Sequence, residues 1–322
     1  MAWGLLAARL PRTMASVRDA HAADDVPSGW TPERIRHAVG ALHYGRRPAA
    51  TVYESLGTDF FLALAPRWLN LGLWEGDGSD PHEAPLAVRR LVRHLARDLP
   101  RHADLLDVGN GLAEQDPVIV SSSAPRSLTA LNLTVAQLRE GRARLAEAGA
   151  HAVGGDAVRM PLRSAAFDGV ICVEAAFHFS SRGGFFDEAI RVLRPGGVLT
   201  MSDIATNRYP LRPREAFAAL TQLRGWGLGL HAAASAGVIA RSMERAGFVD
   251  VRYERAGDRT IAPALRFAHL RLDEERGRLP ATFELTARFM LAQAKTLWDR
   301  GVIDYLFLHG RKPDAIERWE PV

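Results

Sequence analysis

Residues 104–113 read DLLDVGNGLA, and this stretch decides the fold class of the chain. Its first five positions form a short, largely apolar run that is typical of a buried strand, and glycines follow at positions 109 and 111. Glycine lets a backbone turn sharply and come close to a ligand. A glycine-rich turn between a strand and a helix is weak evidence by itself, because ordinary tight loops also use it.

The same alternation of strand and helix continues downstream. Further apolar runs occupy residues 127–133, 151–154, 167–173 and 198–204, and two later ones occupy 248–253 and 304–310. Apolar strands that alternate with helical stretches indicate a parallel sheet covered by helices on both faces. The sequence therefore predicts an α/β, Rossmann-like, mostly parallel sheet of seven strands.

Additions surround this expected sheet. Residues 31–100 carry apolar positions at helical spacing and predict an N-terminal helical lid region. The α/β domain then spans 101–322, with helical cap insertions at about 205–232 and 258–300. Residues 1–30, rich in Ala, Leu and Arg, predict a disordered leader, with Met14 as an alternative start.

Composition excludes several classes of protein. The 322 residues carry a net charge of +4, and the basic residues are scattered among acids, which argues against nucleic-acid binding. Cys172 is the only cysteine, so a disulfide within the chain and thiolate metal clusters are excluded, and a cytoplasmic location fits. No apolar run is long enough to predict a membrane span, and the eleven histidines lack metal-ligand spacing.

Three stretches together carry a family resemblance. GDAVRMPL at 155–162, AFDGV at 166–170 and RVLRPGG at 191–197 resemble the class I S-adenosylmethionine-dependent methyltransferases. The similarity is greatest to the small-molecule group that includes rebeccamycin, erythromycin, sterol and tocopherol methyltransferases, and it covers residues 68–204 well. An NAD-binding interpretation of the glycine turn leaves Gly155, Asp156 and the 195–197 turn unexplained.

The resemblance implies which residues bind the cofactor, S-adenosylmethionine. They are Asp107, Gly109, Asn110, Gly111, Asn132, Leu133, Gly155, Asp156, Ala157 and Glu174. Gly109 and Gly111 would face the methionine part, Asn132 would bond the ribose hydroxyls, and Asp156 would accept from the adenine amino group. The segment 68–74 resembles the part of the family that closes over the cofactor.

Two positions depart from the family pattern. Asn132 stands where Asp or Glu is usual, so a hydrogen bond to ribose would lack charge assistance. Ala113 replaces the third glycine, and its methyl group either fits or crowds the loop. These departures leave open a non-catalytic scaffold that binds S-adenosylmethionine.

The stretch EAAFHF at 174–179 follows the fourth strand, where such sheets bind ligands. The resemblance implies that His178 lies beside the acceptor and acts as a base, with a pKa suited to neutrality. Asp203, which ends the fifth strand, is expected to orient His178 or the substrate. Glu174 is expected to hold the cofactor's ammonium group or, in C-methylation, to stabilise a carbocation.

These residues predict a methyltransferase that acts on a small, largely apolar secondary metabolite. O-methylation with His178 as general base is favoured, with C-methylation of a terpenoid, alkene or aromatic carbon as the alternative. No nucleic-acid or metal site is expected, and the sequence leaves a homodimer open.

Overall fold

The computed structural model describes residues 64–207, 209–226, 228–278 and 281–314. The expected leader, residues 1–30, and residues 31–63 of the expected lid region lie outside the described residues.

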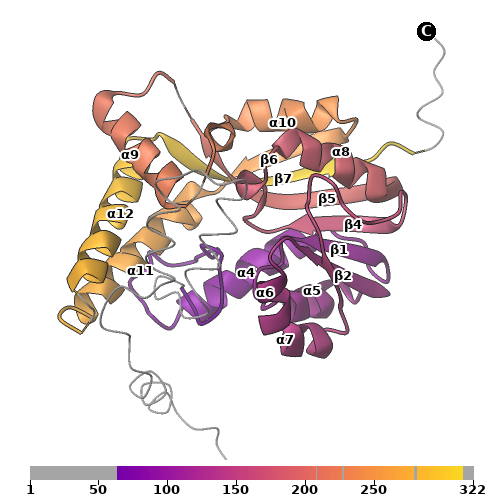
Figure 1. Cartoon of the computed structure of the whole chain (residues 1–322), viewed down its shortest axis with the longest axis horizontal. Helices are drawn as coiled ribbons and strands as arrows, with labels where there is room; N and C mark the ends of the chain where they lie inside the picture. Colours follow the sequence, from indigo (N-terminus) through magenta and orange to yellow (C-terminus); the bar gives the residue numbers. More distant parts are fainter. Residues whose placement is uncertain (1–63, 208, 227, 279–280, 315–322) are drawn as a thin grey trace, which may run out of the picture.

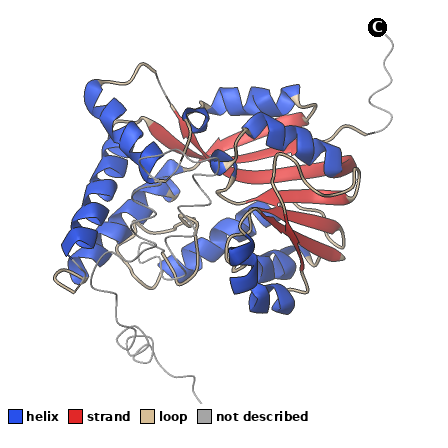
Figure 2. Cartoon of the chain, in the orientation of Figure 1, coloured by secondary structure: helices blue, strands red, loops and turns tan. Residues whose placement is uncertain are grey.

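A sheet of seven strands forms the centre of the molecule (Figure 2). The strands are β1 Asp104–Val108, β2 Ser127–Asn132, β3 His151–Gly154, β4 Phe167–Cys172, β5 Leu193–Thr206, β6 Val249–Arg255 and β7 Ile303–Arg311. Their order is β3-β2-β1-β4-β5-β7-β6, in which only β7 runs antiparallel to its neighbours. This arrangement confirms the predicted Rossmann-like, mostly parallel sheet of seven strands.

Helices cover both faces of the sheet (Figure 1). Helices α4 (Ala84–Ala96) and α5 (Asp116–Ser123) pack on one face, and α8 (Arg182–Val192) and α10 (Ala236–Arg245) pack on the other. Two short helices, α6 (Val135–Glu140) and α7 (Arg142–Glu147), connect β2 to β3. The helical layers explain why the inner strands β1, β4 and β7 are buried at most positions, whereas the edge strands β3 and β6 are largely exposed.

Consecutive strand residues enter opposite cores. Leu105 packs in the cluster beneath α4 and α5, whereas Leu106 packs in the cluster beneath α8 and α10. Tyr305 and Leu306 divide between the two cores in the same way, and all four side chains are fully buried. Because side chains alternate across a strand, every position of such a strand has to suit a core.

The start of β5 differs from the sequence prediction. The expected turn at 195–197 lies inside the strand, which begins at Leu193 and pairs there with Phe167. Gly196 has a φ of +76°, and the pairing with β4 shifts register between Phe167 and Gly169. Gly196 N donates to Lys312 O at 3.0 Å, so the glycines form a bulge that stays paired rather than a turn that ends the pairing.

Further helices lie in both predicted cap insertions. Helix α9 (Pro213–Gly225) follows β5, and α11 (Ile261–Glu274) and α12 (Ala281–Asp299) precede β7. Three short 3₁₀ turns, η1 (Ala176–His178), η2 (Leu230–Ala232) and η3 (Gly257–Arg259), lie in connections. The α9, α11 and α12 group stands beside the sheet at the end where β5 finishes (Figure 1).

Candidate active site

The glycine loop between β1 and α5 makes two close approaches. Gly109 has a φ of +79°, and a Cβ atom there would lie 2.5 Å from the Cβ of Ala175. Gly111 has a φ of +56°, and a Cβ atom there would lie 3.2 Å from Leu69 Cδ1. The loop therefore requires glycine at both positions, for backbone conformation and for space.

Ala113, the departure from the third glycine, is accommodated by a second glycine. Its φ is +65°, a region that disfavours a side chain, yet its methyl group is buried. Gly141, between α6 and α7, lies opposite, and a Cβ atom there would lie 2.9 Å from the Ala113 Cβ. The methyl group fits because residue 141 has no side chain.

Asn132 ties the end of β2 to the glycine loop. Its buried amide donates to Gly111 O at 3.2 Å and to Gln137 Oε1 at 3.0 Å, and its oxygen accepts from Thr134 N at 2.9 Å. Asn110 Oδ1 lies 3.3 Å from the same amide nitrogen. An aspartate here would present oxygens to these three acceptors, which explains why an amide suits this chain.

The residues expected at the adenine end follow β3. Asp156 Oδ1 accepts from Val158 N at 3.1 Å, and Ala157 is buried, while Leu133 is 37% exposed. A Cβ atom on Gly155 would lie 2.6 Å from Pro161 Cδ. The carboxyl ends of β1, β2 and β3 therefore carry the predicted cofactor residues along one edge of the sheet.

A buried pair of acids supports the loop, and one of them was not predicted. Gln115 Nε2 donates to both carboxylate oxygens of Asp107, at 2.9 and 2.7 Å, and Asn110 Nδ2 donates to Asp116 Oδ2 at 3.2 Å. Burial, and then the charge of Asp116, raises the pKa of Asp107. Burial raises the pKa of Asp116 to about 7.

Glu174 joins three parts of the chain. Its Oε1 atom accepts from the Tyr305 hydroxyl at 2.7 Å and from Leu71 N at 2.8 Å, and its own N–H donates to Ser202 Oγ at 3.0 Å. Its φ of +49° lies in the left-handed region, where a non-glycine residue is strained. Burial raises the pKa of Glu174 to about 7.

His178 ends the η1 turn just after Glu174. The ring lies against Phe177, with centroids 4.3 Å apart. Burial, and then the positive charge of Arg182, lowers the pKa of His178 to about 3. This corrects the expected pKa near neutrality, since neither burial nor the arginine was visible in the sequence pattern.

Asp203 forms a buried ion pair with Arg182, the first residue of α8. Arg182 Nε lies 2.7 Å from Asp203 Oδ2, and Nη2 lies 3.0 Å from Oδ1. The two side chains are 6% and 0% exposed. Sequence reasoning missed Arg182, although it lies four residues after His178 and its placement at a helix start gave a signal.

The residues present fit an adenosylmethionine molecule. Gly109 and Gly111 keep the loop free of side chains, as a backbone that cradles a ligand requires. Within the described residues, Asp116 Oδ1 is buried without a hydrogen-bond partner beside that loop, which suits a cationic ligand. Asn132 and Asp156 lie at the two strand ends where a ribose and an adenine are expected.

Comparison with known proteins supports the same assignment. A family model described as a methyltransferase domain matches residues 106–201. Erythromycin 3''-O-methyltransferase of Saccharopolyspora erythraea is 25% identical over 283 residues, covering 83% of this chain and 90% of that protein. The 27-O-demethylrifamycin SV methyltransferase of Amycolatopsis mediterranei is 29% identical over 257 residues, covering 76% and 90%.

The chain is a class I S-adenosylmethionine-dependent methyltransferase. The fold of this methyltransferase is shared with the cyclopropane synthase MmaA2 from Mycobacterium tuberculosis. The TM-score is 0.70 at 18% identity, over 83% of this chain and 99% of that one. The cofactor prediction, S-adenosylmethionine, is confirmed, whereas the individual site residues stay predictions.

The part of the methyltransferase that the structure describes also bears on metal binding and on membrane spans. No group of three His, Cys, Asp or Glu side chains in this part is placed to hold a metal ion. None of its helices is both long and apolar enough to cross a membrane.

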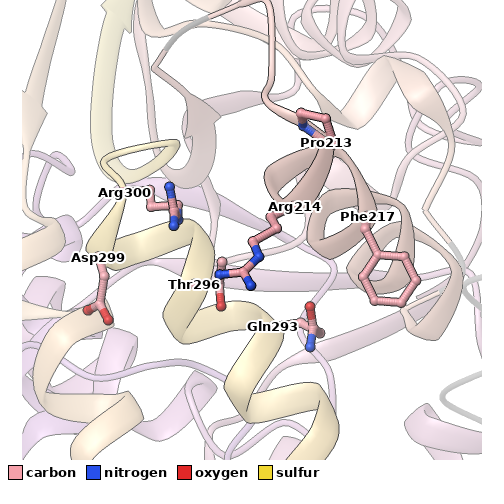
Figure 3. A pocket seen from close by; sticks show the side chains of 7 residues that line it. All are labelled: Pro213, Arg214, Phe217, Gln293, Thr296, Asp299 and Arg300. Atoms are coloured by element: carbon pink, nitrogen blue, oxygen red, sulfur yellow. The ribbon is translucent and has the colours of Figure 1, made fainter.

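The cap of the methyltransferase carries an open cavity of about 770 Å³ (Figure 3). It is lined by Pro213, Arg214, Phe217, Gln293, Thr296, Asp299 and Arg300, from α9 and the end of α12. The predicted site residues do not line it, and its arginines and aspartate differ from the apolar lining expected for an acceptor pocket.

Proposed function

We propose that this methyltransferase transfers a methyl group to a hydroxyl oxygen of a small, largely apolar metabolite, with His178 as the proton acceptor. The observation that carries the proposal is the place of His178, at the end of the η1 turn that follows β4 and four residues after Glu174, and its lowered pKa favours a neutral ring there. The names of two relatives, which specify the 3'' and 27 oxygens of their substrates, support methylation of oxygen.

S-adenosylmethionine, when bound, supplies a methyl group on a sulfonium sulfur that an acceptor oxygen displaces in line. Gly109, Gly111, Asn132 and Asp156 are the residues proposed to hold it. The hydroxyl oxygen forms the new bond to the methyl carbon while the sulfur–carbon bond breaks. The hydroxyl proton then passes to a ring nitrogen of His178, and from there to water.

A weakly basic imidazole is sufficient for this step. The hydroxyl proton becomes strongly acidic as the oxygen gains the methyl group as its third substituent and with it a positive charge, so even a base whose pKa is about 3 takes the proton. The low pKa also keeps His178 unprotonated across the physiological range, and therefore always ready to accept. His178 is half-buried, and burial is the first cause of its lowered pKa.

Asp203 is proposed to act through position rather than as a base. Its two oxygens are bound by Arg182, so the pair is neutral as a unit beside His178. The positive charge of Arg182 still acts on His178 and disfavours the protonated form of its ring. The enzyme is proposed to work in the cytoplasm on a small molecule rather than on nucleic acid, as a monomer or a homodimer.

His178→Ala tests the proposal. We expect turnover to fall by about 10²–10⁴-fold, because general-base contributions have that size, while calorimetry shows unchanged affinity for S-adenosylhomocysteine. His151→Ala, at the exposed start of β3, is the matched control and is expected to keep full turnover. Unchanged turnover in His178→Ala would remove the base role.

A second candidate is methylation of carbon, and the position of Glu174 supports it. A carboxylate near the transfer site stabilises positive charge that develops on an alkene or aromatic carbon. Glu174→Gln should then abolish turnover while His178→Ala leaves it high. O-methylation is favoured if His178→Ala loses turnover while Glu174→Gln keeps it, and if NMR shows the product methyl group on an oxygen.

A further inference from the structure

A segment here called the strap, residues 64–74, crosses the glycine loop and is fastened at both ends. At its start, Arg67 forms ion pairs with Glu114, 3.0 Å away, and with Glu140, 2.9 Å away. At its end, Trp74 N donates to Arg259 O at 2.8 Å. The strap is therefore tied to the loop side of the sheet and to the cap side.

The middle of the strap lies over the cofactor loop. Leu69 reaches Gly111, as the 3.2 Å spacing to a Cβ atom at that position shows. Asn70 is buried, and its side chain donates to Val88 O at 3.3 Å and accepts from Gly72 N at 2.9 Å. These contacts fix the strap relative to the glycine loop and to α4, but they do not attach it to the transfer site.

The attachment to the transfer site passes through one carboxylate oxygen. Glu174 Oε1 receives the Leu71 amide of the strap and the hydroxyl of Tyr305. Tyr305 is the third residue of β7, and its side chain is fully buried in the core beneath α4 and α5. A tyrosine ring held in this way points its hydroxyl in one direction, so it defines where the Glu174 carboxylate can lie.

We propose that Tyr305 is a positioning residue of the transfer site, whose hydroxyl fixes Glu174 so that Glu174 can hold the strap closed over the glycine loop. Within the described residues both of these hydrogen bonds fall on Oε1, which leaves Oε2 for a cationic ligand group. The proposal rests on the cofactor site and not on whether oxygen or carbon receives the methyl group.

The strained backbone of Glu174 supports this role. A left-handed φ at a non-glycine residue costs on the order of 1–3 kcal/mol and persists only where the surroundings over-determine it. The Tyr305 hydroxyl, the Leu71 amide and the Ser202 hydroxyl are the contacts that do so here. Removing one of them should loosen the strap before it disturbs the sheet.

Hydrogen–deuterium exchange of the full-length protein tests the proposal without any ligand. In Tyr305→Phe the ring stays and the hydroxyl is lost, so Glu174 is held less firmly and the Leu71 amide should exchange about tenfold faster, a change of the size that losing one side-chain hydrogen bond produces. Calorimetry should show weaker binding of S-adenosylhomocysteine. Tyr253→Phe, which removes an exposed hydroxyl on β6, is the matched control and should change neither quantity.

Two variants of Glu174 separate the strap contact from stability of the fold. Glu174→Gln keeps an oxygen that accepts from Leu71 and Tyr305, so strap exchange should stay near the wild-type rate. Glu174→Ala removes the acceptor, and strap exchange should rise as in Tyr305→Phe. These two variants also decide the matter if Tyr305→Phe does not fold.

Strap exchange that is unchanged in Tyr305→Phe would overturn the proposal and leave Tyr305 as a core residue alone, and unchanged exchange in Glu174→Ala would show that Glu174 does not hold the strap. A wild-type protein that does not bind S-adenosylhomocysteine would count against the cofactor site instead. Because strap exchange is measured without ligand, the two failures are distinguishable.

Discussion

At this site, burial determines the pKa values of single side chains more than the residue type does. Asp116, Glu174 and His178 all have a pKa that burial moves toward the neutral form, to about 7, about 7 and about 3. Burial therefore disfavours the charged form of each of these three groups before a ligand enters. A cationic cofactor would restore the ionised carboxyl groups, since an opposite charge lowers the pKa of an acid.

Asp116 predicts a pH dependence of stability. Its pKa is about 7 in the fold against 3.8 for the ordinary group, so between these values the folded protein binds the proton that the unfolded chain has lost. Stability should therefore fall as pH rises from about 4 to 7 and then level off. Asp116→Asn should unfold like wild type near pH 4 and be more stable at pH 8, by on the order of 1–4 kcal/mol.

Chemical denaturation at both pH values measures this difference. Asp187→Asn makes the same charge change at an exposed position of α8, and its effect on stability should be small at both pH values. Equal effects of Asp116→Asn at pH 4 and pH 8 would contradict the prediction.

Ala113 and Gly141 predict a reciprocal pair of variants. Gly141→Ala places a methyl group 2.9 Å from the Ala113 Cβ and should destabilise the protein by about 1–3 kcal/mol, the usual cost of overpacking. The double variant with Ala113→Gly should recover only the part of that loss that comes from the Ala113 methyl group, because Leu112 O also lies 2.9 Å from a Cβ atom at 141. Denaturation midpoints of the two single variants and the double variant test this, and additive losses would show that the two methyl groups do not meet.

Elements are held together at this site by polar contacts inside the core. Helix α8 is fixed to the end of β5 by the Arg182–Asp203 pair, and its start is capped by Ser181, whose hydroxyl accepts from Gly184 N at 3.0 Å. The position of this helix determines where an arginine charge lies relative to His178. The ion pair therefore links the position of α8 to the pKa of His178.

Breaking this pair should be costly, and replacing it should not. Arg182→Met or Asp203→Leu alone leaves a buried charge and should cost about 3–5 kcal/mol. The double variant should recover most of this stability although it loses turnover. Lys295→Met removes an exposed partner of Asp299 and should cost less than about 1 kcal/mol. A double variant as unstable as the sum of the single ones would contradict the prediction.

The sequence predicted the bounds of some strands well and the start of one strand wrongly. The run at 104–108 coincides with β1, because a strand buried on both faces is apolar at most of its positions. The run at 151–154 coincides with β3, which is an edge strand and largely exposed, so burial does not explain that agreement. The start of β5 was wrong, because Pro195, Gly196 and Gly197 have the composition of a turn whether or not they stay paired. Only the register with β4 and β7 distinguishes a bulge from a turn.

The candidate site was predictable only in part. Loop glycines and polar residues at strand ends are local signals, and they identified the edge of the sheet that holds the cofactor. The contact of Tyr305 with Glu174 joins residues 131 positions apart and leaves no local pattern. Gln115, Asp116 and Arg182 are polar residues that a sequence pattern assigns to the surface, whereas all three are buried.

At the scale of the whole molecule, ligand binding and stability should be linked. A ligand that binds only the folded state at 100 times its dissociation constant adds about 2.7 kcal/mol. For a domain of this size S-adenosylhomocysteine should then raise the melting temperature by about 5–10 °C. NAD at the same concentration is the control and should have no effect, and an equal shift with NAD would reopen the dinucleotide interpretation of the glycine loop.

The fit between Ala113 and Gly141 also bears on the ancestry of this chain. If the loop once carried glycine at 113, the change to alanine was open only after position 141 had lost its side chain, because the reverse order passes through a clash. Homologous chains with glycine at 113 should therefore carry a side chain at 141 more often, wherever the Leu112 carbonyl, 2.9 Å from a Cβ atom at 141, has also shifted. Chains with alanine at 113 should keep glycine at 141. The residues found together at these two positions therefore indicate which substitution came first.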